Sequence, residues 1–489
     1  MLVANRGEIA VRIIRTCREL GLPVVAVYAP ADRAAPHVQL ADAAFPLPGD
    51  APAASYLNIP SLVEIARRAG AFAVHPGYGF LAESAAFAEA CQAAGLTFIG
   101  PPAAVLALCG DKAVTRERVA AAGVPVLPGT GPLPDEAIAE AARAVGFPLL
   151  IKAAGGGGGK GIHLVRTARS LRQMLRLARG EARSAFGDDR VYLERWLEAA
   201  RHIEVQILAD RTGRVVALGE RDCSVQRRHQ KLIEETPAPQ LAAGRREAML
   251  EAAVRAAAAV GYVGAGTVEF LVTAQGFYFL EINARLQVEH PVTEAVTGLD
   301  LVAEQLRIAQ EGILRVERTP PAQGHAIECR ISAEDPHEGF LPSLGRIEAL
   351  VEPGGPGVRV DSGIRAGSEL TRHYDPLLAK VIVWAPTRGE AIARMRRALE
   401  EMVVAGVATT IPFHRWALVH PEFVAGAHTT AFISRWEAAR PQGTYEDEAV
   451  IAAAAAAFLD AERAAGPPAW AAPGAPSRWI QAAREEGLR

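Results

Sequence analysis

Two glutamates and an asparagine stand at spacings that suit a divalent cation in "TVEFLVTAQGFYFLEIN", residues 267–283. Two strand-like runs flank "TAQG", and a turn centred on Gln275 places Glu269 directly opposite Glu281. Cross-strand partners lie about 5 Å apart at Cβ, so two carboxylates there repel unless one is protonated or a cation lies between them. Asn283 falls on the same face and adds a third oxygen, a set that suits Mg²⁺ or Mn²⁺ carrying nucleotide phosphates. Two independent glutamates on a solvated face are the alternative.

The alternation of polar and apolar residues continues beyond this hairpin through "EINARLQVE", residues 281–289. If the segment is extended, one polar edge runs outward from the metal. Arg285 can then bind an oxyanion, Gln287 can orient it, and Glu289 is placed to accept a proton. An amphipathic edge strand with its charges in water predicts the same pattern.

Five consecutive glycines followed by Lys160 occupy the centre of "LLIKAAGGGGGKGIHLV", residues 149–165. A Walker loop is excluded, because Ala154 stands at its first position and Gly161 at its last. Both flanks are typical of strands, which also excludes the dinucleotide fingerprint, whose glycines open a helix. The backbone N–H groups of a glycine hairpin can bind phosphates. A surface turn without function is the alternative.

Lysine is rare in this chain: only five of the 52 basic residues are lysine, at 112, 152, 160, 231 and 380. Codon bias accounts for the general replacement by arginine. A retained lysine is expected where a compact point charge is needed and a planar fork does not fit. We therefore expect at least three of Lys112, Lys152, Lys160 and Lys231 to contact phosphate or another anion.

Three further segments carry weaker signals. "ERDCSVQRRHQK" concentrates six polar or basic residues between Gln226 and Lys231, which fits either an anion site or an exposed basic loop. "ECRISAEDP" supplies Arg330, and "HPGYGFLAE" supplies Tyr78 in a Gly-Tyr-Gly turn. A lone arginine on a strand is more often a surface or ion-pair residue.

Composition narrows the class of protein. Hydrophobic residues make up 50%, charged residues 22%, and the net charge is -3, so charge gives no case for nucleic-acid binding. Five widely spaced cysteines without a CxxC pair argue for a reducing compartment and against zinc. No apolar run reaches membrane-spanning length. We therefore expect a cytoplasmic protein without membrane or nucleic-acid partners.

The order of apolar runs and amphipathic stretches predicts a chain of mixed α/β and α+β class. Residues 1–110 show the βαβ pattern of an open parallel sheet, and 111–123 form a connecting helix. A compact insertion with the glycine hairpin spans 124–197, and a larger α+β region spans 198–445. The tail, 446–489, combines an alanine-rich helix with a Pro/Gly/Ala linker.

Together these segments resemble the biotin carboxylase family, the ATP-grasp component of acetyl- and acyl-CoA carboxylases and other biotin-dependent carboxylases. The resemblance extends from residue 3 to about 435 and rests on "ANRGEIAVR", "HPGYGFLAE", "GDK", the glycine hairpin, "ERDCSVQRRHQK", "GAGTVEFL", "EINARLQVEHPVTE", "ECRISAEDP" and "YDPLLAKVI". It implies an ATP-grasp fold with an N-terminal Rossmann-like open parallel sheet, a mobile lid and a C-terminal biotin carboxylase domain. It also implies that ATP and bicarbonate form carboxyphosphate, which carboxylates biotin.

The resemblance assigns roles to individual residues. ATP contacts are implied for Lys112, Lys152, Gly158, Gly159, Glu194, Arg195, Trp196, Leu197, His202, Gln226, His229, Glu269, Leu271 and Glu281. Mg²⁺ or Mn²⁺ is implied at Glu269, Glu281 and Asn283, and the family implies two ions. Bicarbonate contacts are implied for Lys231, Arg285, Gln287, the Val288 backbone and Arg330. Glu289 takes the bicarbonate proton, Arg330 stabilises negative charge on biotin, and Tyr78 lines the biotin side.

Partners follow from the same resemblance. None of the five methionines is followed by lysine, the pair that accepts biotin, so a biotin carboxyl carrier protein and a carboxyltransferase are expected on separate chains. The family implies a homodimer. The chain departs from the family in a start a few residues short of the usual one, in Gly161-Ile162 where Gly-Met is common, and in its longer tail.

Three alternatives remain at this stage. Another ATP-grasp ligase shares the metal hairpin but has no reason to keep "RLQVEH" or "QRRHQK". A regulatory protein without chemistry predicts a damaged site, whereas every matched position carries a competent residue. The same half-reaction could also serve a pyruvate carboxylase or a carboxylase with another acceptor, because the acceptor is chosen by the transferase.

Overall fold

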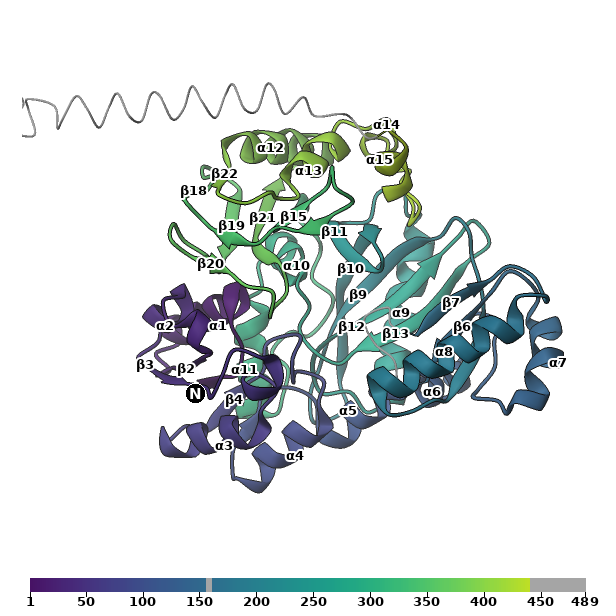
Figure 1. Cartoon of the computed structure of the whole chain (residues 1–489), viewed down its shortest axis with the longest axis horizontal. Coiled ribbons are helices and arrows are strands. Elements are labelled where there is room, and N and C mark those ends of the chain that lie inside the picture. Colours follow the sequence, from purple (N-terminus) through teal and green to yellow (C-terminus); the bar gives the residue numbers. More distant parts are fainter. Residues whose placement is uncertain (155–160, 440–489) are drawn as a thin grey trace, which may run out of the picture. The chain divides into compact units, whose positions relative to one another are not determined.

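The computed structural model describes residues 1–154 and 161–439, and nearly all of them fall in one compact unit, Met1–Ala438. Its strands form three main sheets: an N-terminal parallel sheet, a small antiparallel sheet, and a large antiparallel sheet (Figure 1). The predicted mixture of α/β and α+β architecture is confirmed. The glycine loop at 155–160 and the tail from 440 lie outside the described residues.

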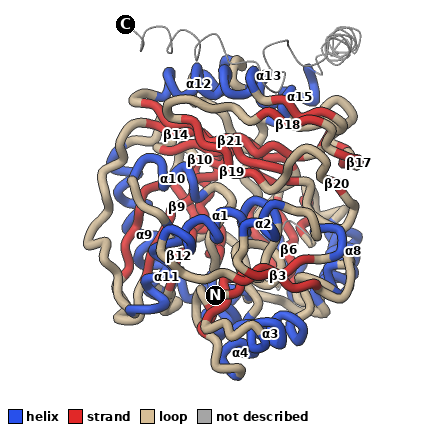
Figure 2. The backbone as a smooth tube through the Cα atoms, turned by 90° about the vertical axis from the view of Figure 1, so that its left-hand side faces the viewer, coloured by secondary structure: helices blue, strands red, loops and turns tan. Residues whose placement is uncertain are grey.

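The N-terminal sheet has the strand order β3-β2-β1-β4-β5, and every neighbouring pair is parallel. Its strands are β1 (Leu2–Val3), β2 (Val25–Tyr28), β3 (Ala43–Pro46), β4 (Ala73–His75) and β5 (Thr97–Phe98). Its helices are α1 (Gly7–Glu19), α2 (Pro36–Leu40), α3 (Ile59–Arg68), α4 (Ala85–Ala93) and α5 (Ala103–Gly110). Helix α1 buries Ile9, Ile13 and Ile14 at helical spacing and also lies against strand β19 of the large sheet (Figure 2).

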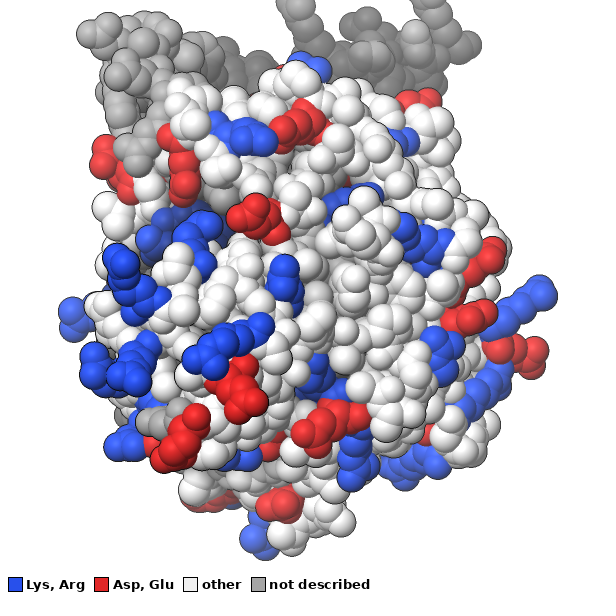
Figure 3. Space-filling model, turned by 90° about the vertical axis from the view of Figure 1, so that its right-hand side faces the viewer, with Lys and Arg blue, Asp and Glu red and all other residues white. Residues whose placement is uncertain are grey.

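The small sheet has the order β7-β6-β8 and follows helix α6 (Lys112–Ala121). Its elements are α7 (Asp135–Val145), β6 (Leu149–Ala153), β7 (Ile162–Val165), α8 (Leu171–Phe186) and β8 (Val191–Arg195). Leu149 pairs with Val165 in antiparallel register, so the predicted strand, glycine loop, strand arrangement is confirmed in its two strands. Helix α8 packs Leu171 and Leu175 onto the sheet and exposes arginines. The face of the molecule on this side carries basic side chains with acidic ones among them (Figure 3).

The large sheet is antiparallel throughout and has the order β13-β12-β9-β10-β11-β14-β21-β19. Its strands are β9 (Arg201–Ala209), β10 (Val215–Arg227), β11 (Gln230–Thr236), β12 (Gly264–Val272), β13 (Phe277–Asn283), β14 (His325–Ser332), β19 (Val358–Ser362) and β21 (Leu377–Ala385). The associated helices are α9 (Ala243–Ala259), α10 (His290–Thr297), α11 (Leu301–Glu311) and α12 (Arg388–Glu401). Alanines of α9 pack closely on the β9 to β13 part of the sheet.

Short elements complete the described chain. They are the strands β15 (Glu334–Asp335), β16 (Leu341–Pro342), β17 (Gly345–Arg346), β18 (Ala349–Val351), β20 (Glu369–Leu370) and β22 (Val403–Ala405), and the helices α13 (Ile411–Ala417), α14 (Pro421–Val424) and α15 (Ile433–Ala439). An aromatic cluster of Phe413, Trp416, Phe432 and Trp436 fixes the last helices onto the β14 and β21 region. These helices thereby cover the β11, β14 and β21 part of the large sheet.

Candidate active site

The predicted metal hairpin is formed by β12 and β13, and Glu269 pairs with Glu281 as expected. The predicted turn centre at Gln275 is wrong. Thr273 and Gly276 close a shorter turn, and a bulge between Glu269 and Phe270 restores the register. The two carboxylates therefore meet because one irregularity offsets the other.

The hairpin carboxylates belong to a row of charged residues that crosses four neighbouring strands. Glu281 on β13 pairs with Glu269 on β12, Glu269 with Glu204 on β9, and Glu204 with Arg221 on β10. Glu204 and Arg221 are completely buried. Since side chains at paired positions lie on the same face of a sheet, this row forms a band of charge along one wall.

Lysines neutralise the glutamates of this row. The Lys231 ammonium lies 2.8 Å from Glu269 Oε1 and 2.6 Å from Glu289 Oε1, and also donates to Glu204. Burial alone would lower the pKa of Lys231, but its three carboxylate partners outweigh burial and hold the pKa well above the usual value. Lys112 forms an ion pair with Glu281. Cationic groups therefore already lie against the carboxylates that are predicted to bind a metal.

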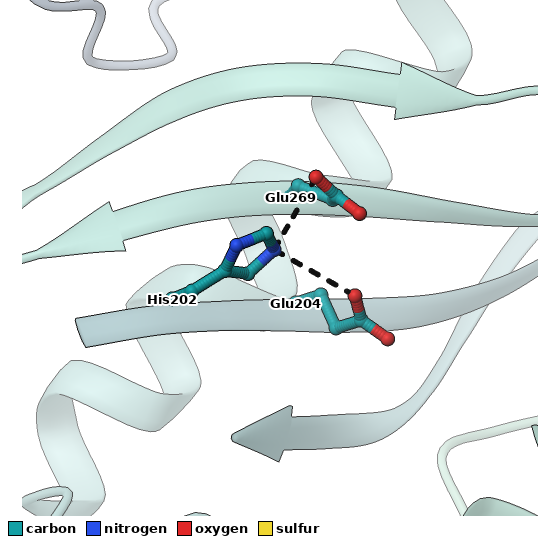
Figure 4. A group of neighbouring side chains, drawn as sticks. All are labelled: His202, Glu204 and Glu269. Atoms are coloured by element: carbon teal, nitrogen blue, oxygen red, sulfur yellow. Dashed lines mark ion pairs between the residues drawn. The ribbon is translucent and has the colours of Figure 1, made fainter. Parts of the chain in front are cut away.

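The donors around the hairpin fit a divalent cation. Glu269 and Glu281 supply carboxylate oxygens, and the buried Asn283 supplies its side-chain Oδ1, which accepts from Arg285 Nη2 over 3.3 Å. The His202 ring lies 3.2 Å from Glu269 Oε2 and 3.8 Å from Glu204 Oε2 (Figure 4). The geometry brings the predicted ligands together and adds His202 and a third glutamate, Glu204, beside them.

Glu289 lies between two cations at the end of the site. Lys231 contacts one carboxylate oxygen, and Arg330 Nη2 lies 2.8 Å from the other. Burial would raise the pKa of Glu289, but Lys231 and Arg330 outweigh burial and hold the pKa far below its ordinary value. Glu234 binds the Nε and Nη2 atoms of Arg330 at 2.6 and 2.5 Å, so Nη2 contacts both carboxylates. The Arg330 guanidinium is thus shared by two buried carboxylates.

The segment that follows β13 differs from expectation. The alternation predicts an extended strand through residue 289, yet β13 ends at Asn283 and a turn precedes α10, which begins at His290. The Gln287 carbonyl accepts hydrogen bonds from the backbone and the ring of His290 and so closes this turn. Arg285, Gln287 and Glu289 still reach one cavity, because the turn brings together side chains that a straight strand would spread apart.

These residues line a cavity of about 490 Å³. Its wall contains nearly all the described residues named by the sequence: Lys112, Lys152, Glu194, Arg195, Trp196, Leu197, His202, Gln226, His229, Lys231, Glu269, Leu271, Glu281, Asn283, Arg285, Gln287, Val288, Glu289 and Arg330. Three of the five lysines thus meet at this cavity. Tyr78 is placed differently: it does not line the cavity, and its hydroxyl donates to Glu8. Gly158 and Gly159 lie outside the described residues.

Sequence reasoning missed three buried residues of the site. Glu204 bonds Arg221 over 2.6 Å and Lys231, while Glu234 holds Arg330. The alternation in "HIEVQIL" carried a signal, because a glutamate between isoleucine and valine indicates a polar face on a buried strand. Arg221 and Glu234 gave no comparable signal, since their importance depends on strands that pair across the fold.

Comparison with known proteins finds matches to three family models, which together cover most of the chain. Residues 1–106 match the family described as biotin carboxylase, N-terminal domain, and residues 328–435 match its C-terminal domain. Residues 111–316 match the ATP binding domain of the carbamoyl-phosphate synthase L chain. Biotin carboxylase 1 of Bacillus subtilis is 50% identical over 442 residues, covering 89% of this chain and 98% of the relative.

The chain belongs to the biotin carboxylase family. A relative from the pyruvate carboxylase of Methanothermobacter thermautotrophicus is 47% identical over 473 residues, covering 95% of this chain and 96% of that protein. The biotin carboxylase domain dimer of Hydrogenobacter thermophilus 2-oxoglutarate carboxylase, solved with MgADP, ADP and bicarbonate, superposes with a TM-score of 0.88 and 46% identity. That comparison covers 90% of this chain and 98% of the solved chain. Sequence identity and structural similarity therefore both support membership of this family.

Among the helices that the structure describes, none is both long and apolar enough to span a membrane.

Proposed function

We propose that this biotin carboxylase uses ATP and bicarbonate to carboxylate biotin on a separate carrier protein. The observation that carries the proposal is the position of Glu289, held by Lys231 and Arg330 in the same cavity as the paired carboxylates Glu269 and Glu281. This arrangement places a proton acceptor, two anion-binding cations and a metal-binding pair around one space. Those are the groups that activation of bicarbonate by phosphoryl transfer requires.

The nucleotide end of the cavity lies at the small sheet and at β12. We assign the ATP phosphates to Lys112 and Lys152, together with the glycine loop, and the adenine to the segment 194–197. Glu194 is buried and pairs with both Lys152 and, at 4.0 Å, Arg116. Mg²⁺ or Mn²⁺, held by Glu269, Glu281 and Asn283, supplies charge neutralisation to the phosphates when bound.

The bicarbonate end of the cavity lies at the turn before α10. We assign bicarbonate to Arg285, Gln287 and the Val288 backbone, with Lys231 between this end and the nucleotide. Glu289 accepts the bicarbonate proton, so that the oxygen becomes a nucleophile toward phosphorus. Arg330 stabilises negative charge that develops on the ureido oxygen of biotin, as a fixed donor does in an oxyanion site.

The remaining assignments concern organisation and partners. We propose functional divisions at 1–110, 111–123, 124–197, 198–445 and 446–489, with 124–197 as the lid. Tyr78 faces the biotin side from the N-terminal part, and the chain works as a homodimer with a biotin carboxyl carrier protein and a carboxyltransferase. A cytoplasmic location accords with five buried, unpaired cysteines. The transferase selects the final acceptor, whether an acyl-CoA or a keto acid.

The decisive experiment measures ADP release by the purified chain with Mg²⁺, ATP and bicarbonate, with and without free biotin. We expect turnover that requires bicarbonate and rises with biotin. Turnover that is indifferent to both would leave an ATP-grasp protein with another acceptor. Net carboxylation of an acyl-CoA by this chain alone would contradict the assignment of carrier and transferase to other chains.

A further inference from the structure

Lys380 is the one lysine of this chain that neither lines the described cavity nor flanks the glycine loop. It lies on β21, directly opposite Arg330 of β14, and its side chain is completely buried. A buried ammonium is costly unless it is fully paired. The residues around Lys380 must therefore supply partners for its ammonium group.

Three separate segments meet at the Lys380 ammonium. Nζ donates to the carbonyl oxygen of Val288 over 2.9 Å, lies 3.1 Å from Glu8 Oε2 on α1, and lies 3.8 Å from Asp361 Oδ2 on β19. Burial lowers the pKa of Lys380, but Glu8, Glu328 and Asp361 outweigh burial and keep the group charged. One cation thus joins the first helix, the large sheet and the turn before α10.

The Val288 carbonyl belongs to the peptide unit that carries the backbone N–H of Glu289. Because Lys380 holds this oxygen, it fixes the orientation of that peptide and limits rotation on both sides of it. Val288 and Glu289 flank this unit, and both line the cavity together with Gln287. The position of Lys380 therefore bears directly on the segment assigned to bicarbonate.

A lysine suits this position better than an arginine. Its charge is concentrated on one atom, which here donates to the Val288 carbonyl and lies within ion-pair distance of Glu8 and Asp361, whereas a guanidinium directs its donors in one plane. The arginine-rich composition makes the exception more informative. A planar fork in this fully buried space would have to displace either the Val288 carbonyl or Glu8.

We propose that Lys380 is a positioning residue that sets the Val288–Glu289 peptide for bicarbonate binding. The inference rests on the proposed function, because it assigns that segment to bicarbonate. Glu8 completes the link, since its carboxylate contacts Lys380 and also accepts from the Tyr78 hydroxyl. Lys380 acts through the backbone and does not itself touch the substrates.

The test compares Lys380→Arg and Lys380→Met with the wild type in steady-state ADP formation, varying bicarbonate and ATP separately. We expect the KM for bicarbonate to rise about tenfold or more, as for loss of a charged hydrogen bond, with the KM for ATP within about twofold. Arg246→Met is the matched control: it also removes an ion pair to a buried glutamate, Glu220 at 2.7 Å, but far along the chain from this turn. It should leave both KM values unchanged.

The inference is overturned if folded Lys380→Arg keeps the wild-type KM for bicarbonate, or if both KM values rise equally. Lys380→Met leaves Glu8 and Asp361 buried without this cation, so its folding is checked by thermal unfolding first. If neither variant folds, Glu8→Gln is measured instead. We expect a rise of about threefold in the KM for bicarbonate alone. An unchanged KM for bicarbonate would contradict the inference. A wild type without bicarbonate-dependent turnover would instead refute the proposed function itself.

Discussion

Replacing Glu289 by glutamine tests the assigned proton acceptor with little change in shape. The substitution removes one negative charge from a buried cluster. Lys231 still forms ion pairs with Glu204 and Glu269, and Arg330 still forms one with Glu234. No cation of this cluster is left without a carboxylate partner. We therefore expect the variant to fold, with a change in unfolding free energy of at most about 2 kcal/mol.

The expected loss of activity is much larger than the change in stability. A positioned general base contributes about 10²- to 10⁴-fold, which corresponds to about 3–5 kcal/mol of barrier. The glutamine at 289 keeps one acceptor oxygen, for either Lys231 or Arg330, and it cannot take a proton from bicarbonate. The loss should appear in kcat for bicarbonate-dependent ADP formation, while the KM for ATP stays near the wild-type value.

The assay is steady-state ADP release at saturating ATP over a range of bicarbonate concentrations. Glu220→Gln is the matched control. Glu220 lies on the same sheet, is also buried, and pairs with an arginine, Arg246 of α9, at 2.7 Å. Glu220 directly precedes Arg221 on β10, and the two pair with the successive residues Val205 and Glu204 of β9. Because successive side chains of a strand point to opposite faces, Glu220 lies on the face opposite that of Arg221. A Glu289→Gln rate within about threefold of wild type, far below the loss expected for a general base, would refute the assignment.

Three further outcomes are expected. Lys231→Met should lower the unfolding free energy by about 3–5 kcal/mol in urea titrations, because it leaves three buried carboxylates without their shared cation. Glu281→Gln should weaken the Mg²⁺-dependent binding of ADP at least about tenfold by calorimetry, whereas exposed Glu251→Gln should not. Burial lowers the pKa of His37 and of His414 to about 4 from 6.5. The unfolded chain therefore binds protons that the native chain does not, so the unfolding free energy should fall between pH 6.5 and 4, and His37→Gln should flatten that fall.

The sequence was most informative where chemistry depended on local periodicity. The pairing of Glu269 with Glu281 and the placement of Asn283 follow from the period of two in a hairpin, which the strands keep from this pair to the pair of Thr267 and Asn283. The turn centre could not be obtained in the same way, because a bulge and a turn shorter by one residue give the same pairing. Periodicity therefore located the pair correctly without locating the turn.

Alternation failed after Asn283 for a physical reason. Polar residues at every second position also suit a turn whose side chains converge on one space, and the start of α10 at His290, with Pro291 following it, makes the chain turn there. The parts of the site that depend on distant strands were out of reach. Arg221 meets Glu204 only because β9 and β10 pair in a register that includes an irregularity between Ala217 and Glu220.

The roles of the glycine loop and of Tyr78 remain predictions, like the other assigned site contacts. The glycine loop is bounded by correctly predicted strands, but its phosphate contacts lie outside the described residues. Tyr78 has its hydroxyl on Glu8, so any contact with biotin would use another part of the ring or a rearranged hydroxyl. The link from Glu8 to Lys380 gives Tyr78 a structural connection to the bicarbonate segment in either case.

The charges around Glu289 also suggest when it can act as a base. In the structure described here Lys231 and Arg330 both bind its carboxylate and keep its pKa low, so it is a weak proton acceptor. Under the proposed assignments the same two cations bind the anionic substrates. An arriving anion that draws Lys231 or Arg330 away removes the cause of the low pKa, and burial then raises it. Base strength would therefore increase only in the loaded site, which disfavours ATP cleavage before bicarbonate has bound.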